Sequence, residues 1–174
     1  MTQPWQTAIS LPRLRTIRGQ DFLFMYHGDN IMTHWAALHS YKYQPLPHAL
    51  KPKTEYLYQN RDPNTLWWRV TTNHLSMKKV VRTGSAKKIR KVFREVLKQQ
   101  GYDAYGRPLA QEHLPEGARL RSKPLRGTLE IRVEPSAITQ RESNMKSQMM
   151  GLLSRTNRAI SDMASAWEKH VPAK

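Results

Sequence analysis

A block of basic residues between Lys78 and Lys98 carries an apolar pattern that a solvated run of charge lacks. Nine lysines and arginines stand in this block against one acid, Glu95. Among them, five apolar residues recur at helical spacing: Ile89, Val92, Phe93, Val96 and Leu97. A helix with this pattern must bury one side against a core, so its basic side chains lie mostly on the other side. The sequence therefore predicts a folded element that presents positive charge.

This helix has a recognisable start and end in the sequence. Ser85 is a suitable N-cap because its hydroxyl can accept a hydrogen bond from an N–H group of the first turn. Gly101 is a natural stop because glycine tolerates the left-handed conformation that follows many helices. Ahead of the helix, residues 74–82 predict a strand, and residues 83–85 predict the turn that joins this strand to the helix.

Further strands complete a predicted domain over residues 54–134. Residues 55–59 and 66–72 are rich in aromatic and β-branched side chains and flank a turn at 62–64, which is typical of a hairpin. Residues 127–133 alternate apolar and polar side chains, as in a strand with one buried face. We predict an α+β fold, a small sheet of three to four mostly antiparallel strands with one packed helix.

Extensions are predicted on both sides of this domain. Residues 1–53 predict an N-terminal arm with a short helix capped by Asn30 and a proline-rich linker at 44–53. Inside the domain, residues 102–124 are rich in Gly, Pro and charge and predict a long loop. Residues 135–174 predict a helix of about 35 residues, which at about 50 Å is longer than the domain. We expect its apolar seam to contact a neighbouring protein, through Met145, Met149, Leu152, Ile160, Met163 and Trp167.

The overall composition favours a polyanionic partner. The 174 residues include 29 lysines and arginines against 13 acids, a net charge of +16. Nucleic acid is the first candidate for such a chain, and an anionic membrane surface is the second. No apolar run approaches the about 18–20 residues that span a bilayer, so we expect no membrane span. Cysteine is absent, which leaves no disulfide, thiol nucleophile or thiolate zinc site.

The sequence holds no recognisable catalytic or metal-binding motif. The spacing of His34 and His39 does not place two ligands on one helical face. Neither a nucleophile elbow nor a glycine-rich phosphate loop is present. We therefore predict no catalytic residue, metal, cofactor or small-molecule substrate, with a small RNA-processing enzyme as a minor alternative.

Phosphate contact is the predicted role of the basic side chains, because solvated charged faces normally mix signs and this one does not. RNA is favoured over DNA because no helix-turn-helix, zinc finger or basic zipper is recognisable. The predicted contacts are Lys78, Lys79, Arg82, Lys87, Lys88, Arg90, Lys91, Arg94 and Lys98, with Arg119, Arg121 and Arg126 as a second group.

Four aromatic residues in the predicted hairpin allow two interpretations: Tyr56, Tyr58, Trp67 and Trp68. Aromatic side chains stack on bases in proteins that bind single strands, but they also fill the core beneath a sheet. Because neighbouring residues of a strand face opposite sides, we expect one tryptophan in the core. The other then needs a cover, either the C-terminal helix or a partner.

Four segments resemble a known family: Glu55–Tyr58, Leu66–Val70, Gly84–Val92 and Leu125–Val133. In this order they resemble the βββαβ domain of mitochondrial large-subunit ribosomal proteins, and in particular the family conventionally numbered forty-nine. The resemblance covers the central domain only. It implies a structural constituent of the mitochondrial ribosome, without catalysis, which binds ribosomal RNA and bridges neighbouring ribosomal proteins with its terminal extensions.

The resemblance also implies a location in the mitochondrial matrix. Arg13, Arg15 and Arg18, with no acid before residue 21, suit an import segment as well as a basic arm that binds the partner, and we favour the arm. The alternative is a stand-alone DNA- or RNA-binding regulator of phage or plasmid type, which places the protein in the cytoplasm.

Overall fold

The computed structural model describes residues 14–37, 51–72, 77–118 and 120–168. Its centre is a four-stranded mixed sheet with the strand order β1–β2–β4–β3. The β1–β2 and β2–β4 pairs are antiparallel, whereas β3 and β4 are parallel. The strands are β1 (Arg15–Arg18), β2 (Phe22–His27), β3 (Leu66–Thr71) and β4 (Gly127–Val133). The predicted α+β class is confirmed.

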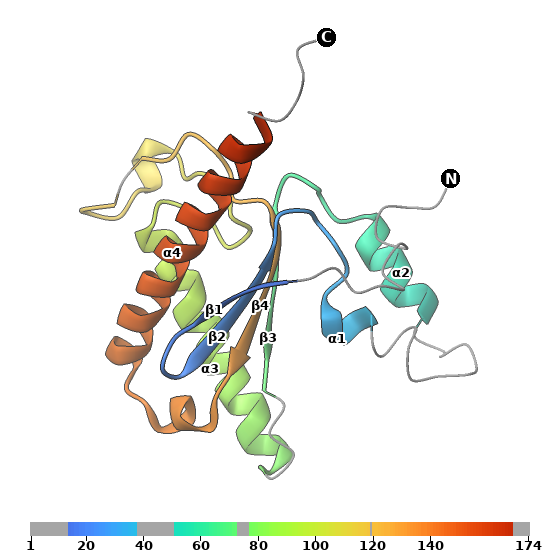
Figure 1. The fold of residues 1–174 in the computed structure, drawn as a ribbon. Coiled ribbons are helices and arrows are strands. Elements are labelled where there is room, and N and C mark those ends of the chain that lie inside the picture. The colour runs from blue at the N-terminus through green and yellow to red at the C-terminus, as the bar shows by residue number, and fades with distance from the viewer. Residues whose placement is uncertain (1–13, 38–50, 73–76, 119, 169–174) are drawn as a thin grey trace.

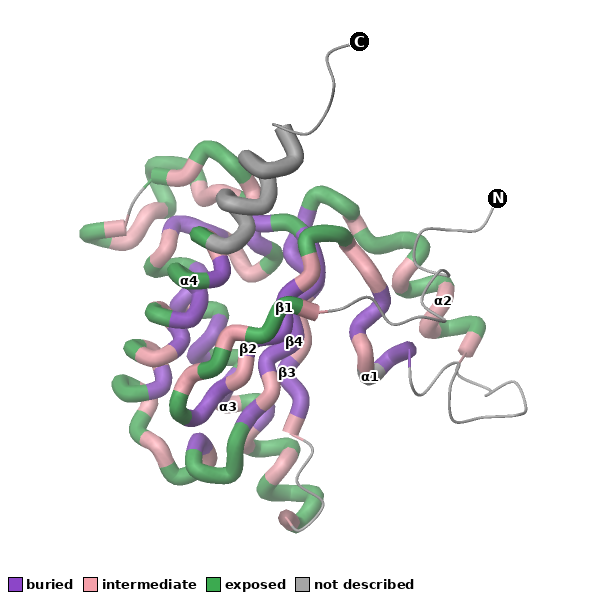
Figure 2. Tube along the Cα trace, in the orientation of Figure 1, coloured by how far each residue is buried: buried purple, intermediate pink, exposed green. Residues whose placement is uncertain are grey.

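Two long helices cover one face of this sheet (Figure 1). α3 (Lys79–Gln99) packs against β3, and α4 (Glu142–Glu168) lies beside α3 against β1 and β2. The five apolar residues of the α3 stripe are each 0% exposed, which confirms the predicted buried side. Figure 2 shows the buried stretches gathered along the strands and along the sides of the two helices that face them. This layer is the main core of the protein.

Two shorter helices lie on the opposite face of the sheet, α1 (His34–Ala37) and α2 (Lys51–Gln59). The Tyr58 ring of α2 is 5.4 Å from the Trp67 ring of β3. The backbone N–H of His34 donates a hydrogen bond to the carboxylate of Glu130 in β4. Because both layers contact β4, every residue of this strand except Arg132 is buried. The predicted strand is therefore confirmed, but its predicted exposed face is wrong.

The predicted hairpin is wrong. Residues 55–59 belong to α2, and β3 pairs with β4 instead. Alternating aromatic residues over so short a segment do not distinguish a strand from a turn of helix, and in this helix Tyr58 faces the sheet while Tyr56 is 65% exposed. The helix also includes the end of the predicted proline-rich linker, since Pro52 stands in its first turn, where a missing N–H costs no helical bond. The rest of the linker lies outside the described residues.

The start of α3 also differs from the sequence prediction. The helix begins at Lys79 and continues through residues 83–85, so the predicted turn and the described end of the predicted strand are both helical. Gly84 is exposed, and the cost of a helical glycine, about 1 kcal/mol relative to alanine, is small beside the burial of the α3 stripe. The predicted end is confirmed, because Gly101 follows the helix with a φ of 86°.

The N-terminal segment contributes half of the strands rather than only an arm. β1 and β2 both precede residue 53, and β2 pairs with β4 along its whole length. Asp21 stands in the turn between them and is 1% exposed. Its carboxylate accepts hydrogen bonds from the Ser136 hydroxyl and, at 2.6 Å, from the Gln148 amide. These bonds hold the β1–β2 turn against the start of the C-terminal region.

The long C-terminal helix is confirmed as α4, which follows a 3-10 turn, η3 (Pro135–Thr139). Three of the six residues predicted to form a protein interface are instead buried within the protein. Met145, Met149 and Leu152 are each at most 1% exposed and belong to the main core. The side chains of Ile160, Met163 and Trp167 lie outside the described part of the helix. The described part of the 102–124 loop contains the 3-10 turn η2 (Gln111–His113) and an isolated β-bridge between Tyr102 and Pro108.

Asn30 and Gly127 join three strands at one end of the sheet. The sequence predicts Asn30 as a helix cap, but its amide N–H group donates to the carbonyl oxygens of Pro63, at 2.7 Å, and Thr65, at 3.3 Å. Its carbonyl oxygen accepts from the Gly127 N–H at 2.7 Å. Gly127 has a φ of 93°, and a Cβ there would collide with the backbone oxygen of His27. Only glycine allows β2 and β4 to meet this closely.

Alanine at position 127 is expected to destabilise the protein strongly. The left-handed backbone costs a non-glycine residue about 1–3 kcal/mol, and the collision with His27 adds to this cost. We expect Gly127→Ala to lower the free energy of unfolding by about 3 kcal/mol or more, measured by urea denaturation followed by circular dichroism.

The matched control is Gly84→Ala, which replaces an exposed helical glycine whose new Cβ would meet nothing within 4 Å beyond its chain neighbours and the nearby backbone of its own helix. Because alanine favours the helix, this variant should be more stable than the wild type by about 0.5–1 kcal/mol. A loss of stability would mean that residues 83–85 form the turn predicted from the sequence.

Candidate nucleic-acid interface

The helix α3 presents most of the predicted phosphate-contacting side chains. The nine predicted contacts between Lys78 and Lys98 are called the main group. Seven of them are exposed: Lys78, Lys79, Lys87, Arg90, Lys91, Arg94 and Lys98. Arg82 and Lys88 are partly buried. α3 therefore carries exposed positive charge on one side, while its other side packs into the core.

Two of these residues are used partly within the protein. Lys88 Nζ donates a hydrogen bond of 2.9 Å to the backbone oxygen of Gln140. Lys91 Nζ lies 3.9 Å from a carboxylate oxygen of Glu95 and 3.8 Å from one of Glu142. Glu95 also pairs with Lys146, whose ammonium lowers the pKa of that carboxyl. These contacts link α3 to α4, so we do not place Lys88 and Lys91 at the centre of an interface.

In the second predicted group, Arg121 lies near the C-terminal end of α3. Arg121 donates two hydrogen bonds of 3.0 Å to Gln100 and stacks its guanidinium 5.6 Å from the centre of the Tyr102 ring. Arg121 therefore holds the loop against the end of the helix. Arg126 is exposed just before β4, and Arg119 lies outside the described residues.

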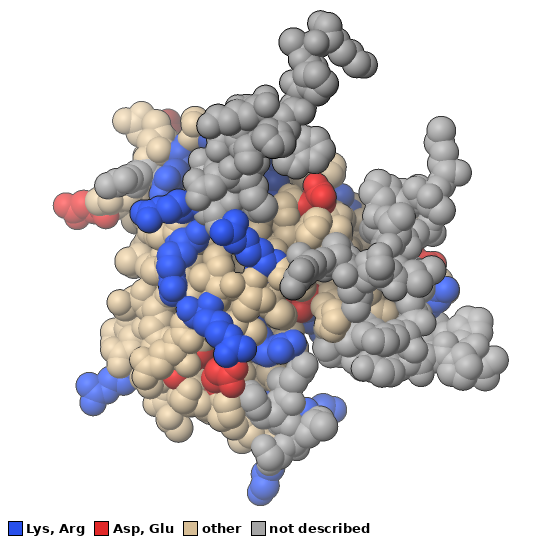
Figure 3. Space-filling model, viewed as in Figure 1, with Lys and Arg blue, Asp and Glu red and all other residues tan. Residues whose placement is uncertain are grey.

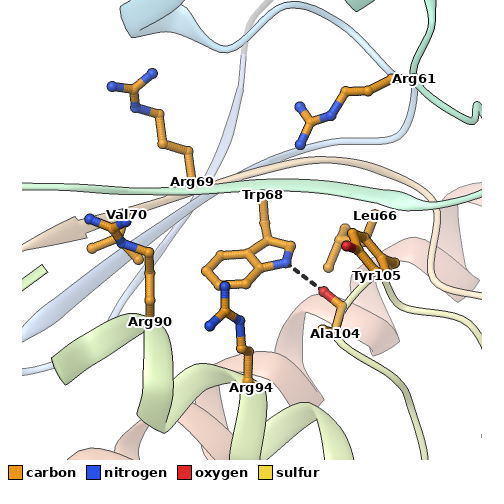
Figure 4. Close-up of a pocket in the computed structure, with 9 residues that line it drawn as sticks. All are labelled: Arg61, Leu66, Trp68, Arg69, Val70, Arg90, Arg94, Ala104 and Tyr105. Carbon is orange, nitrogen blue, oxygen red and sulfur yellow. Dashed lines mark hydrogen bonds between the residues drawn. The ribbon is translucent and has the colours of Figure 1, made fainter. Parts of the chain in front are cut away.

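A pocket beside β3 brings arginines from three elements together (Figure 4). Its volume is about 450 Å³. Figure 4 shows Trp68 in its middle, Arg90 and Arg94 rising from α3, Arg61 and Arg69 on the other side of the strand, and Tyr105 at the far end from Arg90. None of its described lining residues is acidic; we call it the β3 pocket and define it by Arg61, Leu66, Trp68, Arg69, Val70, Arg90, Arg94, Ala104 and Tyr105.

A second hollow of about 350 Å³ continues the β3 pocket toward the start of α3. The two share Arg69, Val70 and Arg90, and the hollow adds Lys79 and Arg82 from the main predicted group. Arg82 Nε is buried and has no hydrogen-bond partner among the described residues. The groove formed by both hollows thus follows the outer edge of β3.

Sequence reasoning missed Arg61 and Arg69 as members of this site. Neither belongs to a run of charge, since Arg61 follows α2 and Arg69 lies within β3. The one sequence feature that could have identified these two arginines is their position close to aromatic residues. The Arg61 guanidinium lies 5.5 Å from the Tyr58 ring centre and 5.2 Å from that of Trp67, a cation–π arrangement. Only the packing of α3 against β3 reveals that they adjoin Arg90 and Arg94.

The four aromatic residues of the predicted hairpin separate in the structure. Trp67 is 4% exposed and faces α2. Trp68 faces α3, where its ring centre is 4.8 Å from that of Phe93 and its indole N–H donates to Ala104 at 2.9 Å. Its cover is therefore α3 rather than the predicted C-terminal helix or a partner. Tyr56 is exposed on α2, away from the β3 pocket.

Burial and like charge act together on Arg69. Burial lowers the pKa of its guanidinium, and the nearby Arg90 lowers it further, while Tyr58 and the Glu130 carboxylate act in the opposite direction. Glu130 in turn is 2% exposed, and burial raises its pKa despite its hydrogen bond with His34 and the nearby Arg69 and Arg132. Burial is therefore the largest effect on the pKa of both groups.

A further basic surface lies on the face drawn in Figure 3, which carries β1 and α4. Basic side chains form a curved band there, with few acidic side chains in it. Arg15 and Arg18 of β1 are exposed, and Arg155 of α4 donates to the Arg18 backbone oxygen at 3.3 Å. The sequence prediction assigned the basic residues of this segment to an arm.

Comparisons with models of protein families, with curated proteins and with solved structures found no match to this chain. No helix in the described residues is long and apolar enough to cross a membrane. Among the same residues, no three His, Asp or Glu side chains form a group suited to a metal ion. Of the four segments behind the family resemblance, residues 55–58 form a helix where it implies a strand, while residues 66–70 and 127–133 lie in strands and residues 84–92 in a helix.

The buried carboxylate of Glu130 predicts a pH-dependent stability difference. Below about pH 4 this carboxyl is protonated in both the folded and the unfolded chain. As the pH rises above its unfolded pKa, the unfolded state loses the proton first, so the wild type loses stability until the pH exceeds the raised folded pKa. We expect Glu130→Gln to be more stable than the wild type at pH 8, with the difference vanishing toward pH 4.

Urea denaturation of both proteins across this pH range measures the difference, and Glu55→Gln on α2 is a control for the loss of one carboxylate. A larger advantage of Glu130→Gln at pH 4 than at pH 8 would contradict the assignment.

Proposed function

We propose that this protein binds RNA through α3 and the β3 pocket, as a structural constituent of the mitochondrial ribosome. The observation that carries the RNA contact is the β3 pocket itself. Arg90 and Arg94 of α3 line it on one side of β3, Arg61 and Arg69 lie on the other side of this edge strand, and none of the described lining residues is acidic. Such a cluster of arginines around one strand edge favours an anion with several charged oxygens, because each guanidinium can bind phosphate oxygens bidentately.

The exposed lysines of α3 extend this surface. Lys79 and Lys87 lie on the same helix as Arg90, Lys78 directly precedes it, and none of the three makes an ion pair among the described residues. A phosphate backbone can occupy such a row without sequence-specific contacts, and its binding releases condensed counterions. The affinity is therefore expected to fall steeply with salt and to depend little on RNA sequence.

The ribosomal setting rests on the family resemblance described above and on the high positive charge of the whole chain. A large folded RNA offers phosphates to several separate surfaces, which suits a protein with basic residues on α3, in the β3 pocket and along β1. Neighbouring ribosomal proteins are then the proposed partners of the terminal extensions. The proposed location is the mitochondrial matrix.

Charge reversal in the β3 pocket should weaken RNA binding without unfolding the protein. We expect Arg90→Glu and Arg94→Glu each to lower RNA affinity about 10- to 100-fold, the effect of losing a charge-assisted hydrogen bond. The slope of log K against log salt should also become shallower by about 1 for each phosphate that the variant no longer neutralises. Fluorescence anisotropy with labelled RNAs of different sequence measures both quantities.

The matched control is Lys53→Glu, which makes the same charge change at an exposed position of α2 and should leave the affinity within about twofold. Circular dichroism checks the fold of each variant. Loss of helicity in Arg90→Glu would place this residue in the core, and unchanged affinity in both arginine variants would reject the proposed surface.

The native protein should sediment with ribosomal particles from mitochondria. In a sucrose gradient, its distribution should follow one ribosomal subunit and shift to light fractions after ribonuclease treatment. A protein that stays light without nuclease would instead fit the stand-alone regulator or the RNA-processing enzyme, and pelleting with membranes after nuclease would fit a lipid-bound protein.

A further inference from the structure

The β3 pocket differs from the rest of the basic surface in size and shape. Most of the α3 lysines lie on a convex helix, which can follow a backbone but cannot enclose a ligand. The pocket has about 450 Å³, within the about 300–1,000 Å³ of small-ligand sites. It is large enough for one nucleotide unit and too small for the side of a double helix.

The cationic side chains of the pocket are held in place before any ligand binds. The Arg94 guanidinium lies 5.9 Å from the centre of the Trp68 ring, and Arg90 Nε donates to the Ala86 backbone oxygen at 3.1 Å. Arg61 lies over two aromatic rings on the other side of the strand. Each guanidinium keeps further N–H donors for a ligand. Because these side chains are already ordered, binding costs less conformational entropy.

Tyr105 provides an aromatic face at one end of the pocket. It is 62% exposed, and its ring makes no aromatic contact with another described residue. Its backbone is fixed, because its N–H donates to Asp103 at 2.7 Å and its oxygen accepts from the Leu66 N–H at 2.8 Å. Trp68, in contrast, is occupied by its contacts with Phe93 and Ala104.

The edge of β3 adds backbone donors to the pocket. Since the Leu66 N–H bonds to Tyr105 rather than to β4, and since alternate residues of a strand direct their N–H groups to the same side, the N–H groups of Trp68 and Val70 also face away from β4. An extended acidic peptide can use such an edge. The clustered guanidinium groups beside an exposed aromatic face favour RNA instead, because RNA joins phosphates to planar bases.

We propose that the β3 pocket holds an unpaired nucleotide of a single-stranded or looped RNA, with its phosphate on Arg90 and Arg94 and its base stacked on Tyr105. This inference rests on the proposed RNA binding and specifies that the nucleotide bound in the pocket is unpaired. Bases in a duplex are stacked inside the helix and cannot reach Tyr105.

The test compares a labelled single-stranded RNA with the blunt duplex formed from it. We expect Tyr105→Ala to weaken single-strand binding about 5- to 150-fold, the effect of losing one base–aromatic stack, and to leave duplex binding unchanged. Tyr105→Phe should bind like the wild type because it keeps the ring. Tyr56→Ala removes a ring that is equally exposed, at 65%, and should bind both RNAs like the wild type.

The outcomes separate this inference from the proposed function. If the wild type binds neither RNA at low salt, the proposed function fails. If it binds RNA and Tyr105→Ala weakens both ligands equally or neither, the nucleotide pocket is overturned and phosphate binding stands. If a polyglutamate peptide binds the wild type and Tyr105→Ala weakens only that peptide, the pocket is a peptide site. Thermal melting by circular dichroism shows that each variant is folded.

Discussion

The parallel pairing of β3 with β4 is the constraint on which the remaining structure depends. Parallel neighbours cannot be joined by a tight turn, so the connection must cross one face of the sheet, and here that connection contains α3. The crossing buries the apolar side of α3 and brings its arginines to the edge of β3. β2 then pairs with the other side of β4, which makes β4 a central strand buried by a layer on each face.

The acidic residues are distributed so that they leave this edge positively charged. The chain has few acids for its 29 lysines and arginines, and several act within the fold. Asp21 joins the β1–β2 turn to α4, Glu95 pairs with Lys146 and Lys91, and Asp62 pairs with Arg107 at 2.7 Å. Glu130 is buried under α1. The described lining of the β3 pocket therefore contains four arginines and no acid, which is the electrostatic basis for proposing a polyanionic ligand.

The sequence predictions succeeded where the pattern was long and local. The α3 stripe, the stop at Gly101 and the strand at 127–133 each follow from the order of apolar and polar residues or from glycine conformation. They failed where neighbouring segments decide the outcome. Residues 55–59 have a strand-like composition, yet they form α2 because Tyr58 can pack on Trp67. Gly84 looks like a turn residue, but the helix continues through it because the buried stripe that follows is long.

By itself, the sequence determined that a basic helix with an apolar back exists, that the fold is α+β, and that the chain is strongly cationic. These properties depend on composition and on contacts between residues a few positions apart. The tertiary structure alone decided that β1 and β2 join the sheet, that Met145 and Met149 belong to the core, and that Arg61 and Arg69 adjoin the arginines of α3. The physical reason is that strand order and helix placement depend on burial shared between distant segments, which no local period encodes.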